Sequence, residues 1–428
     1  MSGMNSMERE QKKRQLKRRI VEPETAAGEP GRRRESYGEK EEEIAKRAER
    51  RSRRKRLRIA LILVLCLLGT VSGVVLYSQR RQYTEYTVAW EKEIPASESS
   101  FTEYVKFGDN ILKYTKDGAS YIDRSGNAVW SLSYQLKAPV CYVNGDFAAI
   151  ADQQGNSIFI CDKTGCKGEA TTLLPILRVS VSAYGVAAAL VEDSTASYIT
   201  FFKSDGSSLD WGIKTVMSGS GYIMDVSLSP DGTQVMLSCL YLQEGMLKNR
   251  IVFYNFSEFG KSYPDRLVGG FEEFSDSICP RVRFLDEDHA CALADGQLGF
   301  FSLENVTSPE LTKQIPVEQE IQGIAYSSEY VAIVSEHPDG EYDSRLDVYD
   351  AAGTLISSRE FTYPWQKLEI DGDFVILYND HSCKIFSTSG RERFSGEFDF
   401  TVSQITRGSR FNSLIITGGD RMREIRLK

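Results

Sequence analysis

Histidine and the short motifs of known catalytic sites are scarce in this sequence of 428 residues. The three histidines, His289, His337 and His381, fall in separate segments that no zinc-binding spacing joins. The sequence contains no D-x-D-x-D-G calcium loop, no G-x-S-x-G nucleophile elbow and no P-loop. These absences exclude the metal, serine-hydrolase and nucleotide sites that such motifs define. We therefore predict no catalytic, cofactor-binding or metal-binding residue and no cofactor.

Adjacent cysteines, which many quinone-cofactor enzymes carry, are also absent. Cys66 lies in an apolar run, and seven cysteines follow it: Cys141, Cys161, Cys166, Cys239, Cys279, Cys291 and Cys383. Because seven is odd, at least one of them is unpaired within a monomer. Cys161 and Cys166 flank a four-residue turn and are a candidate disulfide, although so small a loop would stabilise little. We expect most of the others to be small apolar residues buried in strands.

Long apolar runs are lacking, with one exception near the start. From Ile59 to Gln79 there are 21 consecutive residues without charge, enough as a helix to cross a bilayer core of about 30 Å. A buried core helix would be shorter and would lack basic clusters at both ends. A cleaved signal peptide would have a shorter leader than the 58 residues that precede this run. We predict a transmembrane signal-anchor helix over residues 59–79.

The segment before that run is basic, with 20 Lys and Arg against 11 Asp and Glu in residues 1–58. It has too few large apolar residues to fold, so we predict a disordered cytoplasmic tail. The positive-inside rule predicts a single-pass protein of the cell membrane, with the N-terminus cytoplasmic and the remainder extracytoplasmic. Anionic lipid is the expected partner of the tail, a docking protein is an alternative, and nucleic acid is disfavoured because no aromatic residues are interleaved. The membrane-flanking basic cluster comprises Arg53, Arg54, Lys55, Arg56 and Arg58.

Residues 83–428 contain an internal repeat. Short β-branched runs alternate with Gly, Asn, Asp and Ser turns, which indicates an all-β fold. In five units an apolar strand is followed by a turn that reaches a glycine, and degenerate copies centre on Tyr254 and Phe301. Eight units of about 40–45 residues each match the four-stranded blade of a β-propeller, and seven longer blades are the alternative. The repeated glycines are Gly126, Gly165, Gly206, Gly353 and Gly390.

The two ends of this region complement each other. The last unit has only three strands, while residues 84–94 form an unassigned strand just after the apolar run. Tyr86, Val88 and Trp90 alternate there with polar residues, as in a half-buried strand. We predict that this strand completes the last blade and closes the ring, which removes the open sheet edges.

Two short motifs carry a family resemblance. Asp123, Gly126 and Trp130 form a D-x-x-G-x-x-x-W pattern that resembles the repeat of quinoprotein-dehydrogenase-like propellers, which include partner-binding assembly lipoproteins without a cofactor. The sequence Ser229–Gly232, SPDG, is similar to the TolB-type propeller repeat. The whole chain resembles an uncharacterised bacterial family of single-pass membrane-anchored propellers. These motifs specify a turn rather than a reaction, so the resemblance implies a fold and not an activity.

Three functions are compatible with such a chain. The first is a binding or scaffold module for a protein or an envelope polymer on the external face. The second is an extracytoplasmic hydrolase or quinoprotein-like enzyme, and the third is a transmembrane sensor. The missing nucleophile and metal motifs favour binding. We expect two long loops, Cys239–Arg250 and Ser335–Arg345, to contribute to the partner surface, because loops on a rigid scaffold commonly carry recognition.

Overall fold

The computed structural model describes residues 60–70, 73, 81–94, 101–216, 219–337 and 340–428. The chain divides into two compact units, Met1–Arg80 and Arg81–Lys428. The two units are described separately, and the second unit contains all of the strands that the structure describes.

The predicted transmembrane helix over residues 59–79 is wrong. Residues 60–70 and 73 are helical, and the residues that flank them are outside the described ranges. Across the described residues, no helix has both the length and the apolar character needed to span a membrane. The predicted disordered tail and its basic cluster lie outside the described residues. The predicted cell-membrane location is untested by any described residue and stays a prediction.

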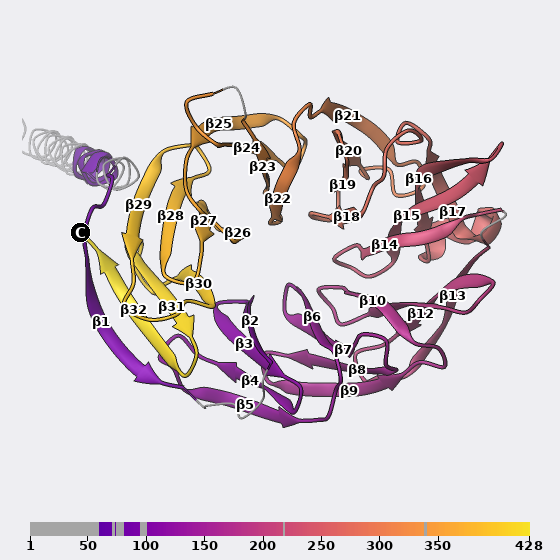
Figure 1. The fold of residues 1–428 in the computed structure, drawn as a ribbon, viewed down its shortest axis with the longest axis horizontal. Coiled ribbons are helices and arrows are strands. Elements are labelled where there is room, and N and C mark those ends of the chain that lie inside the picture. Colours follow the sequence, from indigo (N-terminus) through magenta and orange to yellow (C-terminus); the bar gives the residue numbers. More distant parts are fainter. Residues whose placement is uncertain (1–59, 71–72, 74–80, 95–100, 217–218, 338–339) are drawn as a thin grey trace, which may run out of the picture. The chain divides into compact units, whose positions relative to one another are not determined.

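The described residues of the second unit form eight four-stranded sheets arranged in a ring, so the predicted eight-bladed β-propeller is confirmed (Figure 1). We number the blades in chain order. Blades 1 and 2 comprise β2 (Thr102–Phe107), β3 (Asn110–Thr115), β4 (Gly118–Ile122), β5 (Ala128–Ser133), β6 (Pro139–Asn144), β7 (Phe147–Asp152), β8 (Ser157–Asp162) and β9 (Gly165–Thr171). Blades 3 and 4 comprise β10 (Ile176–Val181), β11 (Ala187–Glu192), β12 (Ala196–Phe202), β13 (Ser208–Val216), β14 (Tyr222–Leu228), β15 (Gln234–Gln243), β16 (Met246–Asn255) and β17 (Leu267–Phe271).

The remaining four blades follow the same order. Blades 5 and 6 comprise β18 (Arg281–Phe284), β19 (His289–Ala294), β20 (Gln297–Ser302), β21 (Glu310–Pro316), β22 (Ile321–Tyr326), β23 (Tyr330–Glu336), β24 (Ser344–Asp350) and β25 (Leu355–Phe361). Blades 7 and 8 comprise β26 (Lys367–Asp371), β27 (Phe374–Tyr378), β28 (Ser382–Ser387), β29 (Glu392–Glu397), β30 (Gln404–Arg407), β31 (Ser413–Gly418), β32 (Arg421–Leu427) and β1 (Tyr86–Glu93). Two short 3₁₀ helices, η1 (Glu258–Ser262) and η2 (Pro264–Arg266), connect β16 to β17.

Each blade is an antiparallel meander, and this gives the propeller two different faces. Connections between strands 1 and 2 and between strands 3 and 4 emerge at one end of the sheet, which we call the glycine-turn face. Connections between strands 2 and 3, and from strand 4 to the next blade, emerge at the other end, which we call the long-hairpin face. The five repeated glycines all lie at connections between third and fourth strands. At Gly206 the φ is 84°, and a Cβ atom would lie 2.2 Å from the Glu169 carbonyl oxygen, so only glycine fits.

The hydrophobic core lies between neighbouring blades. Second strands such as β11 and β27 are almost entirely buried, because they are covered by other sheets on both faces. One cluster joins blades 3 and 4 through side chains that include Phe201 and Leu237, and another joins blades 6 and 7 through Val348 and Leu377. Each blade is therefore stabilised mainly by its two neighbours, as in other repeat architectures.

The strand β1 pairs with β32 and supplies the fourth strand of blade 8 (Figure 1). The register pairs Tyr86 with Leu427 and then shifts between Val88 and Trp90. Because of this bulge the simple alternation of the sequence is broken, and Val88 is 48% exposed. Trp90 is half-buried, packs against the cluster between blades 8 and 1, and donates a hydrogen bond from Nε1 to Glu424 Oε2 at 2.8 Å.

We expect the substitution Trp90→Ala to lower the free energy of unfolding by about 2 kcal/mol or more, because it removes apolar contacts and leaves the Glu424 carboxylate without this donor. The matched control is Val88→Ala on the same strand, for which we expect a change of about 0.5 kcal/mol or less, since that side chain is exposed. Chemical denaturation of both variants measures the difference. Equal losses would contradict the assignment of Trp90 as the anchor of β1.

Candidate functional site

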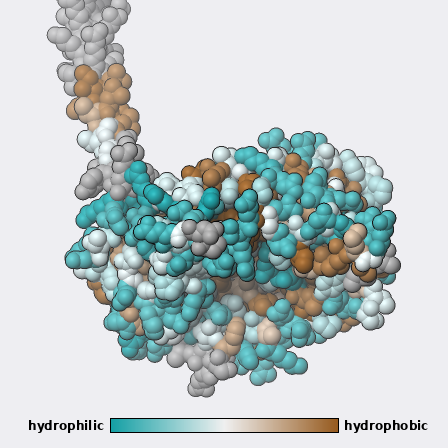
Figure 2. Space-filling model, turned by 45° about the horizontal axis from the view of Figure 1, so that its top comes forward, coloured by the Kyte–Doolittle hydropathy of each residue, from teal (hydrophilic) through white to brown (hydrophobic). Residues whose placement is uncertain are grey.

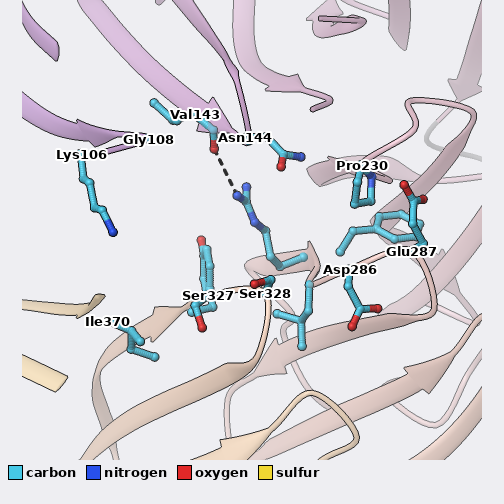
Figure 3. Close-up of a pocket in the computed structure, with 15 residues that line it drawn as sticks. Lys106, Gly108, Val143, Asn144, Pro230, Asp286, Glu287, Ser327, Ser328 and Ile370 are labelled. Carbon is cyan, nitrogen blue, oxygen red and sulfur yellow. Dashed lines mark hydrogen bonds between the residues drawn. The ribbon is translucent and has the colours of Figure 1, made fainter. Parts of the chain in front are cut away.

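A cavity of about 560 Å³ opens on the propeller axis at the glycine-turn face (Figure 3). It lies on the axis because six different blades line it, each through the end of its inner strand or the turn that follows. The polar side chains that line it are Lys106, Asn144, Arg283, Asp286, Glu287, Tyr326, Ser327 and Ser328. None of them was singled out by the sequence, because residues that meet on an axis come from positions far apart in the chain.

Arg283 crosses this axial cavity. It lies at the end of β18 in blade 5, and its Nη2 donates a hydrogen bond of 3.4 Å to the Val143 carbonyl oxygen in blade 2 (Figure 3). Its guanidinium lies 5.1 Å from the ring centroid of Tyr326 in blade 6, a cation–π distance. One side chain thus links three blades around the axis.

An ion pair links blade 1 to blade 7 beside the same cavity. Lys106 Nζ lies 2.5 Å from Asp371 Oδ1, and the Asp371 side chain is only 8% exposed. Asp371 Oδ2 also accepts the backbone N–H of Arg407 in blade 8 at 2.8 Å. The carboxylate therefore holds three successive inner strands together, and it is already satisfied before any ligand enters.

The acidic wall of the cavity is the turn from β18 to β19. Asp286 accepts the backbone N–H of His289 at 2.7 Å and lies 2.9 Å from His289 Nδ1. Burial and the charge of Asp231 raise the pKa of Glu287 above its ordinary value. Because Lys106 is paired with Asp371, the charged side chains that blade 5 offers to a polar ligand group are Arg283, Asp286 and Glu287.

The three histidines lie on separate blades. His289 belongs to the turn just described, His337 Nε2 lies 3.2 Å from Glu360 Oε1, and the backbone N–H of His381 donates to the Asn379 side chain. Within the described ranges, no three His, Cys, Asp or Glu side chains gather in a way that could hold a metal ion.

The two predicted loops both connect a second strand to a third, so both lie on the long-hairpin face. The segment Cys239–Arg250 is not a loop, because β15 and β16 continue through it as paired strands of ten residues each. They turn at Glu244 and Gly245, whose φ angles of 52° and 78° fit a tight two-residue hairpin. The segment Ser335–Arg345 joins β23 to β24, with residues 338–339 outside the described ranges.

The long hairpin ends in exposed apolar side chains. Leu242, Met246 and Leu247 are 55%, 56% and 53% exposed, and Leu242 pairs directly with Leu247 across the two strands. We call these three residues the β15–β16 tip. Apolar patches are separate and limited on the largely hydrophilic propeller surface visible in Figure 2. Because the three residues lie on two adjacent cross-strand pairs, they form one apolar cluster at the end of the hairpin.

Two polar contacts hold the hairpin between its neighbouring connections. Lys248 Nζ forms an ion pair with Asp276 in the connection from blade 4 to blade 5. Arg250 Nη2 donates to the Gly219 carbonyl oxygen in the connection from blade 3 to blade 4, at 3.1 Å. Val216 at the end of β13 and Ile278 in the connection from blade 4 to blade 5 are also exposed apolar side chains.

The candidate disulfide residues lie on adjacent strands of blade 2. Cys161 on β8 is directly opposite Cys166 on β9, and both are free thiols. Their pairing as a disulfide stays a prediction.

A family model described as "Family of unknown function (DUF5711)" matches residues 79–427. No curated protein matches the sequence. Among solved structures, the computationally designed protein Ika8 is similar with a TM-score of 0.51 and 12% identity over 78% of this chain and 98% of that chain. BamB from Moraxella catarrhalis is similar with a TM-score of 0.46 and 12% identity over 80% of this chain and 100% of that chain. Identities this low concern the fold alone.

Replacing Lys106 tests the ion pair at the axial cavity. We expect Lys106→Met to lower the free energy of unfolding by about 2 kcal/mol, because it leaves the buried Asp371 carboxylate without its cation. Adding Asp371→Asn should restore part of this loss, since a neutral amide still accepts the Arg407 N–H. As a control, Lys261→Met breaks an exposed pair with Glu258 and should change stability by about 0.5 kcal/mol or less. Additive losses in the double variant would contradict the coupling.

Proposed function

The chain belongs to the family of unknown function DUF5711, and from its surface we propose that this propeller is a protein-binding module whose partner contacts the β15–β16 tip on the long-hairpin face. The single observation that carries the proposal is the exposure of three large apolar side chains on one hairpin. Apolar area removed from water is the main favourable term in most protein associations, roughly 25 cal/mol per Å².

The hairpin is rigid before any partner arrives. Its strands pair without interruption from Gln234 with Asn255 to Gln243 with Met246, and Lys248 and Arg250 fix it on both sides. A preorganised surface loses little conformational entropy on binding, so more of the gain from apolar burial appears as affinity.

The charge around the β15–β16 tip indicates what kind of partner fits. Glu244 lies in the turn, and Glu272 and Glu273 lie in the connection beside the hairpin, all of them exposed. Of the nearby cations in the described part of the chain, Lys248 is paired with Asp276, and Arg250 donates to the Gly219 carbonyl oxygen, so the three carboxylates outnumber the one unpaired cation. An apolar tip with an acidic surround fits a protein surface that has an apolar groove with basic residues at its rim.

A protein partner is preferred here over an envelope polymer because the exposed side chains are aliphatic. The enzyme and sensor functions that the sequence left open stay predictions. The loop Ser335–Arg345 lies on the same face, with blade 5 between it and the hairpin, and it is a second candidate for contact with a large partner.

The test compares two pairs of exposed apolar residues in the full chain. In the first variant, Leu242→Ser and Leu247→Ser remove the apolar tip. In the control, Leu355→Ser and Ile356→Ser change side chains that are 48% and 44% exposed on the outer strand of blade 6. Because all four side chains are exposed, we expect both variants to keep the unfolding temperature of the unchanged protein within a few degrees.

Crosslinking in the native cell, followed by mass spectrometry, measures the partner set of each variant. We expect the main crosslinked protein to be lost, at least tenfold, from the tip variant and kept by the control. If the tip variant keeps the full set of partners, the binding surface lies elsewhere. If both variants lose the same partner, the effect is not specific to the hairpin and the proposal is wrong.

A further inference from the structure

We propose that Cys161 and Cys166 form a redox-active dithiol on blade 2 that exchanges with low-molecular-weight disulfides, with Cys166 as the attacking sulfur and Cys161 as the resolving one. This site is independent of the proposed protein-binding surface. For the candidate disulfide pair, the proposal specifies which sulfur attacks and which resolves, and it names small disulfides as the substrate class.

The strand register places the backbones of the two cysteines within the span of a disulfide. Cys161 and Cys166 are direct partners in the register of β8 and β9, and Cα atoms of such partners lie about 4.5–5.5 Å apart. Disulfides join Cα atoms separated by roughly 4.4–6.8 Å. The turn between them is fixed, because Asp162 Oδ1 accepts the backbone N–H groups of Thr164 and Gly165 at 2.7 and 3.1 Å.

The two thiols differ in their surroundings. Cys161 is completely buried in the apolar cluster between blades 1 and 2, whereas Cys166 is exposed. A hydrogen bond between the two side chains lowers the pKa of Cys166 to about 7 and raises that of Cys161. As a thiol, Cys166 donates from Sγ to the Gly168 carbonyl oxygen at 3.5 Å. As a thiolate, the form that attacks disulfides, it is stabilised by the adjacent buried Cys161 thiol.

Other charges near the pair oppose this effect or are already neutralised. Glu169 on β9 raises the pKa of Cys166, and Asp162 raises that of Cys161. Lys167 Nζ lies 3.0 Å from Asp162 Oδ2. From blade 3, the Asp205 backbone packs against Gly168, and its carboxylate accepts from Ser207. The Cys161 thiol is therefore the largest influence that lowers the pKa of Cys166, and the Gly168 backbone is a smaller one.

The other cysteines of the described part of residues 81–428 are poorly placed for this chemistry. Burial raises the pKa of all five, which are Cys141, Cys239, Cys279, Cys291 and Cys383. All of these except Cys141 are no more than 1% exposed. Cys66 lies in the other unit and is exposed, so it has to be replaced in any test.

The reaction consumes one small disulfide and releases two small thiols. The Cys166 thiolate attacks one sulfur of the disulfide, forms a mixed disulfide and expels the first thiolate, which takes up a proton. Cys161 then loses its proton, attacks the Cys166 sulfur and expels the second thiolate, which is protonated in turn. Two electrons pass from the protein dithiol to the small disulfide. The closed loop is so short that the bond contributes little to stability, which favours reversible exchange over a structural role.

Alkylation by iodoacetamide tests the hydrogen bond, in the full chain carrying Cys66→Ser. We expect the alkylation rate of Cys166 to rise with pH, to be half-maximal near pH 7 and to level off above it. In Cys161→Ala, which removes the donor, the midpoint should move towards pH 8.5, the ordinary value for a thiol. At pH 7 the parent should react about three times faster than this variant, because its larger thiolate fraction is partly offset by lower nucleophilicity.

Oxidised glutathione tests the exchange itself. We expect mass spectrometry to find an internal disulfide between Cys161 and Cys166 in the parent, and a persistent glutathione adduct on Cys166 in Cys161→Ser, whose hydroxyl keeps a donor but cannot resolve the adduct. The Cys141→Ser control should behave as the parent does. A Cys166 midpoint near pH 8.5 in the parent, an unresolved adduct in the parent, or a disulfide from Cys161 to Cys141 would each overturn the proposal.

Discussion

The pairing of β1 with β32 is the interaction on which the rest of the propeller depends. It joins strands that lie at opposite ends of the second unit, and it turns eight stacked sheets into a closed ring. Beside the backbone ladder, Arg423 on β32 contacts Glu91 on β1 at 2.7 Å and also pairs with Asp399 before β30. An open ring would expose an unpaired strand edge and the apolar faces of blades 8 and 1.

Both candidate surfaces need that closed ring. Arg283 can reach the Val143 carbonyl oxygen across the axis only if blades 5 and 2 are held at a fixed separation. The connections on either side of blade 4 contact the β15–β16 hairpin through Lys248 and Arg250. Ring closure therefore fixes the positions of the blades relative to one another. The axial cavity and the β15–β16 tip both depend on these fixed positions to bind one ligand in preference to another.

The number of blades was predictable because most blades share a turn, between their third and fourth strands, that requires a glycine. A positive φ at Gly206 or Gly126 requires glycine, and a positive-φ glycine recurs at this turn in five of the eight blades. Blade 4 lacks such a turn, since η1 and η2 replace it, and it was recognised only from its strand around Tyr254. The dipeptide Glu244–Gly245 is a hairpin signal that could have shown the segment Cys239–Arg250 to be paired strands. The prediction of a membrane-spanning helix over residues 59–79 rested on the hydropathy and length of the run alone, and no described helix meets both requirements.

The axial cavity could not be predicted in the same way. Lys106 and Asp371 are 265 positions apart, and nothing in either local sequence indicates that they meet. The bulge that exposes Val88 is likewise set by the partner strand rather than by the alternation around it. Contacts between side chains that ring closure brings together can be identified only from the three-dimensional structure.

Removing the closing strand tests the central claim most directly. Thermal unfolding would be measured for a chain that begins at Tyr83 and for one that begins at Ser97, which lacks β1. The account predicts one cooperative transition for the first chain and a transition at least 10 °C lower, or no cooperative transition, for the second, because the ring is open and blade 8 has lost a strand. Equal unfolding temperatures for the two chains would contradict it.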